Sequence, residues 1–83
     1  MNINELRQKA EKGNTTARNE LRKMANAGDV DAQMALGSCY YYGIGVQKDY
    51  NEAYKWFSEA AKKGNPAAKR HLTELPEKKI NEL

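Results

Sequence analysis

The side chains that most often carry catalysis or bind metals are scarce in this chain. Its 83 residues include one histidine, His71, and one cysteine, Cys39. A metal site needs further ligands at suitable spacing, and the sequence places no second His or Cys for that purpose. Gly43 and Gly45 lack the preceding strand and the third glycine of a dinucleotide-binding loop. We therefore expect a protein that is not an enzyme and has no catalytic residue, cofactor or bound metal.

Charge is distributed unevenly along the chain. Residues 1–28 carry six basic and three acidic side chains, whereas residues 29–83 carry eight of each. The basic third leaves open an alternative function in nucleic-acid binding, but the interspersed acidic residues favour an ordinary solvated helical surface. The sequence contains no stretch apolar enough for a membrane span and no signal peptide. We expect a cytoplasmic protein without a membrane partner.

The elements that must position any site are predicted to be helices. Apolar residues recur every three or four positions, and no segment alternates as a strand would. Gly, Asn and Asp separate these segments, ending one helix and capping the next. We predict an all-α fold of about five helices near residues 3–12, 15–27, 30–42, 50–63 and 66–75, with a break at Pro76 and a short C-terminal tail helix in 77–83.

A short pattern at the helix starts occurs three times. It has the form Gly-Asn/Asp-x-x-Ala-x-x-x-Leu and begins at Gly13, Gly28 and Gly64. The intervals are 15 and 36 residues. A unit of about 35 residues with two helices is typical of helical solenoids. The longer interval therefore holds one full helix-loop-helix unit, and the shorter one lacks the loop and one helix.

Residues 31–66 resemble a Sel1-like repeat, a relative of the tetratricopeptide repeats. The residues that match the family pattern are, in chain order, Ala32, Leu36-Gly37, Tyr40, Gly43-Ile44-Gly45-Val46, Asp49, Ala53, Trp56, Ala60-Ala61 and Gly64-Asn65. The resemblance implies a short right-handed array of paired helices in a single domain. It places truncated capping helices in 1–28, a complete repeat in 29–65, and a partial repeat with a C-terminal cap in 66–83. It also implies an adaptor or scaffold for other proteins.

Exposed apolar side chains on the predicted helix over 30–42 are the first candidates for a partner-binding site. Cys39 lies on its inner face, where a buried packing thiol is the expected role. The residues that point away from that face are Met34, Ser38 and Tyr41, with Tyr42 beside them. Tyr and Met are enriched in interfaces, which favours contact with a peptide or surface patch of another protein. Alternatively, the helix over 66–75, or the tail through Ile80 and Leu83, covers Met34 and Tyr41.

Two arginines are the second candidates. Arg18 and Arg22 lie one helical turn apart and suit an acidic partner, or they pair with Glu11 or Glu20. We expect a small adaptor or inhibitor that binds a protein and is a monomer or a weak homodimer. The alternative is a regulator associated with nucleic acid that uses the basic N-terminal third. By analogy with proteins of this size, one form would be a mobile-element-encoded inhibitor of a bacterial nucleoprotein machine.

Overall fold

The computed structural model describes residues 2–74, and these residues form five helices connected by short turns and one longer loop. The helices are α1 (Ile3–Glu11), α2 (Thr15–Asn26), α3 (Val30–Tyr42), α4 (Tyr50–Lys62) and α5 (Pro66–Glu74). The all-α prediction is confirmed, and the predicted helix ends agree to within one residue. The tail helix predicted for 77–83 lies outside the described residues.

The three copies of the glycine pattern adopt one geometry. Gly13, Gly28 and Gly64 have φ of 90°, 101° and 91°, which terminates the preceding helix in the left-handed region. The next residue in each copy caps the following helix: the side-chain oxygens of Asn14, Asp29 and Asn65 accept from backbone N–H groups at 2.9, 3.0 and 2.9 Å. Asn14 is thus the cap of α2.

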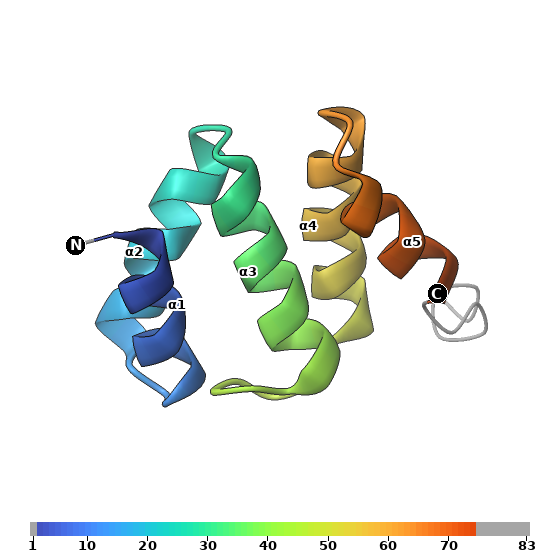
Figure 1. Ribbon diagram of the computed structural model, residues 1–83. Helices are drawn as coiled ribbons and strands as arrows, with labels where there is room; N and C mark the ends of the chain where they lie inside the picture. The colour runs from blue at the N-terminus through green and yellow to red at the C-terminus, as the bar shows by residue number, and fades with distance from the viewer. Residues whose placement is uncertain (1, 75–83) are drawn as a thin grey trace.

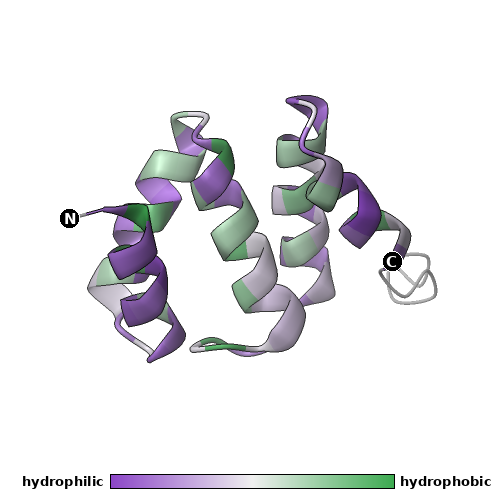
Figure 2. Ribbon diagram, in the orientation of Figure 1, coloured by the Kyte–Doolittle hydropathy of each residue, from purple (hydrophilic) through white to green (hydrophobic). Residues whose placement is uncertain are grey.

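The helices stand in a row with neighbours antiparallel, from the α1–α2 pair at one end to α5 at the other (Figure 1). Helix α3 packs against α2 on one side and α4 on the other, and α1 also touches α3. Figure 2 shows α3 as largely pale to green, and so more hydrophobic, and α1 as mostly purple, and so more hydrophilic. Helix α3 is the more hydrophobic because a helix with neighbours on both sides buries more of its circumference. The described part of the chain measures 36 × 26 × 17 Å.

Two apolar clusters form the core on either side of α3. The larger one holds the buried side chains of Leu6, Ala10, Ala17, Leu21, Ala25, Ala32, Ala35, Leu36 and Trp56. The smaller one is centred on Ala53 and Phe57 of α4, with five half-buried side chains packed around it. Tyr40 contacts both clusters and so joins them. The apolar residues that recur every three or four positions in 3–12 and 15–27 therefore face this core.

The loop between α3 and α4 ties the N-terminal helices to the repeat. Gly43 and Gly45 both have positive φ, 70° and 73°, which lets the chain turn away from α3. A β-carbon at Gly45 would collide with the carbonyl oxygen of Ala10, so the loop backbone lies directly against the end of α1. The loop closes where the Asp49 N–H donates to the Tyr40 carbonyl at 2.9 Å and the Asp49 side chain caps α4.

Candidate partner-binding surface

A groove lies between α1 and α3 and has a volume of about 400 Å³. The lining residues recur along both helices at intervals of three and four positions, as expected when one face of each helix borders the groove. The lining residues are Ile3, Asn4, Arg7 and Glu11 from α1, and Asp31, Met34, Ala35 and Ser38 from α3. Ala35 is buried and Met34 and Ser38 are half-buried, whereas Arg7 and Asp31 are exposed. The groove therefore has an apolar floor and a charged rim.

The charged side chains on this rim have no ion-pair partner among residues 2–74. Among the described residues, Glu20 pairs with Lys23 at 3.5 Å and Glu59 with Lys62 at 3.4 Å, and His71 Nδ1 lies 3.7 Å from the Glu74 carboxylate. All three lie away from the groove. Arg7, Glu11 and Asp31 consequently present one positive and two negative charges to solvent beside an apolar floor. Such a mixed rim can select the charge pattern of a bound segment.

The structure brings Met34 and Ser38 together in this groove but gives Tyr41 a different environment. The Tyr41 ring lies 6.3 Å from that of Phe57 and 6.0 Å from that of His71, measured between ring centroids. Met34, Tyr41 and Leu72 all pack against the Ala53–Phe57 cluster. The helix at 66–74 thus lies beside Tyr41, whereas Met34 also lines the α1–α3 groove. The tail through Ile80 and Leu83 lies outside the described residues.

Tyr42 is the more accessible of the two adjacent tyrosines, with 56% of its surface exposed. Its ring meets that of Tyr41 edge-on, with centroids 4.7 Å apart. Desolvation raises the pKa of the Tyr41 hydroxyl, and the neighbouring Tyr42 and Glu74 add to the effect. Tyr41 therefore acts as a packing residue at the C-terminal end of α3, and Tyr42 is its exposed neighbour.

The two arginines on α2 do not form the ion pairs that the sequence suggests. Arg22 is exposed and its Nη2 donates to the Tyr40 hydroxyl at 2.7 Å, while Arg18 is half-buried. Among the described residues Glu20 pairs with Lys23 instead. The six predicted site residues thus fall into three neighbourhoods: the α1–α3 groove, the aromatic end of α3, and α2.

The residues that sequence reasoning missed are those of α1. Asn4, Arg7 and Glu11 flank the predicted apolar stripe at spacings of three and four, so their common face is readable from the sequence. Only the tertiary structure shows that α1 lies beside α3 as well as α2. Without it, the charged flank of α1 cannot be assigned to a groove with Met34 and Ser38.

The other reactive side chains are engaged in packing. Cys39 is 1% exposed, and desolvation raises the pKa of its thiol, with the negative charge of Glu11 adding to the shift. A buried thiol with a raised pKa is a poor nucleophile. The His71 ring stacks on Phe57 with centroids 4.6 Å apart. Residues 2–74 contain no group of three or more His, Cys, Asp and Glu side chains that could hold a metal ion.

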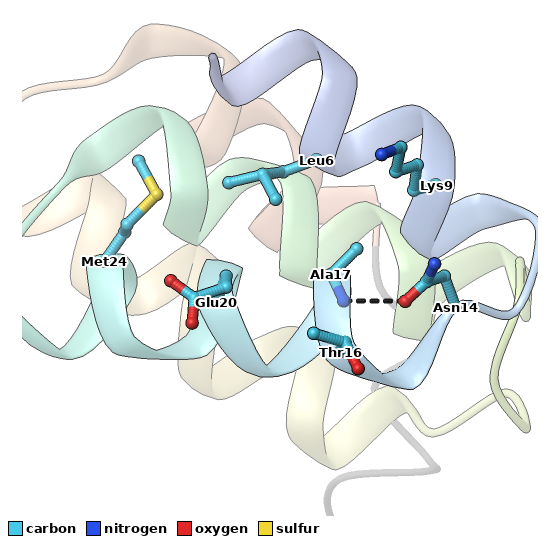
Figure 3. Close-up of a pocket in the computed structure, with 7 residues that line it drawn as sticks. All are labelled: Leu6, Lys9, Asn14, Thr16, Ala17, Glu20 and Met24. Atoms are coloured by element: carbon cyan, nitrogen blue, oxygen red, sulfur yellow. Dashed lines mark hydrogen bonds between the residues drawn. The ribbon is translucent and has the colours of Figure 1, made fainter. Parts of the chain in front are cut away.

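A further hollow of about 380 Å³ lies between α1 and α2, at the N-terminal end of the row. Figure 3 shows that Leu6 and Lys9 come from α1 and the remaining lining residues from the turn and α2. The hydrogen bond from the Ala17 N–H to the Asn14 side chain forms part of its wall. Its lining includes none of the six predicted site residues.

No helix within 2–74 has the length and apolar character needed to span a membrane.

The row of antiparallel helices, with one turn geometry used three times, defines a helical-repeat protein. Residues 30–65 match the family model of the Sel1 repeat. The chain therefore carries a Sel1 repeat in α3, the following loop and α4, and the resemblance seen in the sequence is confirmed. No solved structure shows a significant match to the chain.

Curated proteins that resemble the chain are much longer. An uncharacterized Sel1-like repeat-containing protein of Schizosaccharomyces pombe is 50% identical over 38 residues, which is 46% of this chain and 6% of that protein. The DAP3-binding cell death enhancer 1 of Mus musculus is 39% identical over 51 residues, 61% of this chain and 10% of that protein. A component of an ERAD-associated E3 ubiquitin-protein ligase of Arabidopsis thaliana is 35% identical over 56 residues, which is 66% of this chain and 8% of that protein.

Proposed function

We propose that this chain is a non-catalytic protein-interaction module, a small adaptor or inhibitor, that holds a segment of a partner protein in the α1–α3 groove. One observation carries the proposal: the groove combines an apolar floor at Met34 and Ala35 with charges on its rim that lack partners in residues 2–74. Relatives named for binding a protein, or as a component of a ligase, agree with an interaction role.

The size and charge of the groove set the kind of segment that fits. A volume of about 400 Å³ lies at the lower end of the range for ligand pockets, so it admits one or two side chains rather than a folded domain. Asp31 and Glu11 favour a basic side chain, and Arg7 favours an acidic one. We infer that the bound segment carries a small apolar side chain with charges of both signs beside it.

Site-directed photocrosslinking tests this proposal. A photoreactive residue at Ser38 reports on the groove, and the same residue at Tyr54 of α4, which is 44% exposed, is the matched control. We expect one crosslinked protein from Ser38, reduced when Asp31→Lys reverses a rim charge, and no such product from Tyr54. Equal crosslinking from both positions, or no effect of Asp31→Lys on a folded variant, would exclude the groove as the binding site.

The same experiment separates the alternative function. Loss of every captured protein after nuclease treatment, or a steep loss with salt, would favour the basic N-terminal third with Arg18 and Arg22 over the groove. That outcome would support a regulator of a nucleoprotein complex, including the mobile-element type. The cytoplasmic location and the monomer or weak homodimer remain predictions, which fractionation and light scattering test.

A further inference from the structure

A separate depression of about 280 Å³ lies where the α2–α3 turn meets α4. It shares no lining residue with the α1–α3 groove. The side chains that matter for its chemistry are Gln33 from α3 and Lys55, Trp56, Glu59 and Lys63 from α4 and its C-terminus. It contains none of the residues proposed above to bind a partner.

Two residues that line this depression each carry a buried polar atom with no hydrogen-bond partner among residues 2–74. Gln33 and Trp56 are 2% and 3% exposed, and neither Gln33 Oε1 nor Trp56 Nε1 is bonded. Leaving a buried donor or acceptor unpaired costs about 1–3 kcal/mol, so such atoms are uncommon. The residues described contain one other such side-chain atom, on His71, and it lies elsewhere. Two such atoms on residues that line the same depression are therefore a specific feature of the molecule.

The orientation of the Gln33 amide is set by a bond at its other end. Its Nε2 donates to the Ala25 carbonyl at 3.0 Å, which leaves Oε1 as the free acceptor. The indole N–H of Trp56 is a donor only. Gln33 and Trp56 therefore offer one acceptor and one donor, and a group that satisfies both must itself donate and accept.

Long lysine side chains form the movable part of the wall. Lys55 Nζ lies 4.8 Å from the centroid of the Trp56 ring, and Lys63 Nζ donates to the Gly28 carbonyl at 2.6 Å. Both hydrogen-bonding atoms are shielded from solvent, so a ligand can reach them only after side chains of the wall move, and the lysines are its flexible part. The Glu59 carboxylate is paired with Lys62 at 3.4 Å, which leaves two ammonium groups to face an anion.

We propose that this depression is a second binding site, one that takes an amide group of a protein segment with a carboxylate nearby. The amide oxygen accepts from Trp56 Nε1, and the amide N–H donates to Gln33 Oε1. The carboxylate lies against Lys55 and Lys63. The amide belongs to an asparagine or glutamine side chain or to the main chain, and these two sources share the same chemistry.

Three small probes test the site and separate the sources. N-acetyl-asparagine carries both kinds of amide, N-acetyl-leucine keeps only the main-chain type, and 4-methylpentanoate keeps the carboxylate and the branched chain without an amide. Because Trp56 is the only tryptophan, its indole N–H gives a single resonance in a ¹⁵N–¹H spectrum. We expect saturable shifts of this resonance and of the Gln33 side-chain amide with N-acetyl-asparagine. N-acetyl-leucine shifts them equally if the main-chain amide is the source, and less if the side-chain amide is.

Variants complete the test. Gln33→Met keeps the volume but removes the acceptor, and we expect the dissociation constant of N-acetyl-asparagine to rise roughly threefold to tenfold. Ser38→Ala, in the other groove, leaves it unchanged, so failure here is distinguishable from failure of the proposed function. If Gln33→Met does not fold, Trp56→Phe removes the donor instead, and the Gln33 amide resonance becomes the reporter.

Two outcomes overturn the proposal. One is an equal response to 4-methylpentanoate, which lacks the amide. The other is an indole resonance that shows a long-lived bound water and moves with none of the probes, because the unpaired atoms would then be satisfied by solvent alone.

Discussion

Gly37 of α3 faces the ring of Phe57 so closely that a β-carbon at position 37 would lie 2.6 Å from Cε1 of that ring. The ring has little room to retreat, because the imidazole of His71 stacks on it with centroids 4.6 Å apart. A missing side chain on α3 thus determines how α4 and α5 pack.

The first prediction follows from this contact. Gly37→Ala should destabilise the protein by about 1–3 kcal/mol, because overpacking outweighs the gain in helix propensity of about 1 kcal/mol. Urea denaturation measures the loss. Ser38→Ala, one residue along the same helix, is the control and should change stability by less than about 0.5 kcal/mol. A Gly37→Ala variant at least as stable as the parent would show that the ring moves freely.

The second prediction concerns the contact between the α3–α4 loop and α1. Gly13 and Gly45 both have positive φ, but a β-carbon has open space at Gly13 and meets the Ala10 carbonyl at Gly45. Gly13→Ala should cost about 1–2 kcal/mol for the backbone conformation alone. Gly45→Ala should cost more and should increase hydrogen exchange in α1. Equal losses in the two variants would mean that the loop does not hold α1 in place.

The third prediction is a pH dependence that originates at Cys39. Burial raises the pKa of this thiol above its ordinary value of 9.0, with Glu11 adding to the shift, so the folded state holds the proton more tightly than the unfolded chain does. The resulting stabilisation is complete below pH 9.0 and is lost as the pH rises through the folded-state pKa. Unfolding free energy measured from pH 7 to 11 should therefore fall more steeply in the parent than in Cys39→Ala. Parallel curves would contradict the prediction.

The fourth prediction tests how α5 is held. The Asn65 side chain caps this nine-residue helix by accepting from the Ala68 N–H at 2.9 Å. Isolated helices of that length are marginal, so Asn65→Ala should lose about 1 kcal/mol. The loss should appear as faster hydrogen exchange in α5 alone. Asn65→Asp retains the cap and is the control. Uniformly faster exchange throughout residues 2–74 would indicate instead that α5 opens only with the whole domain.

Local structure was predictable because it depends on neighbours in the chain. A glycine in the left-handed region and an Asn or Asp cap lie within a few residues of each other, so the repeated pattern from Gly13, Gly28 and Gly64 predicts the helix ends. Helical periodicity likewise predicts which face of each helix is apolar, and the apolar side chains of Leu21, Leu36 and Phe57 are fully buried. The spacing of family residues identified the Sel1 repeat, which the family model places at 30–65.

Only the tertiary structure determined which helix faces outside the inner stripes contact one another. Helical periodicity places Met34 and Tyr41 off the inner face of α3. It does not predict whether another helix covers them. Packing directs Met34 and Ser38 to a groove shared with α1, and it turns Tyr41 toward Phe57 and His71. The unpaired atoms of Gln33 and Trp56 are likewise invisible in the sequence. Whether a buried polar atom is hydrogen-bonded depends on partners distant in the chain, and only the folded structure determines which partners lie within bonding distance.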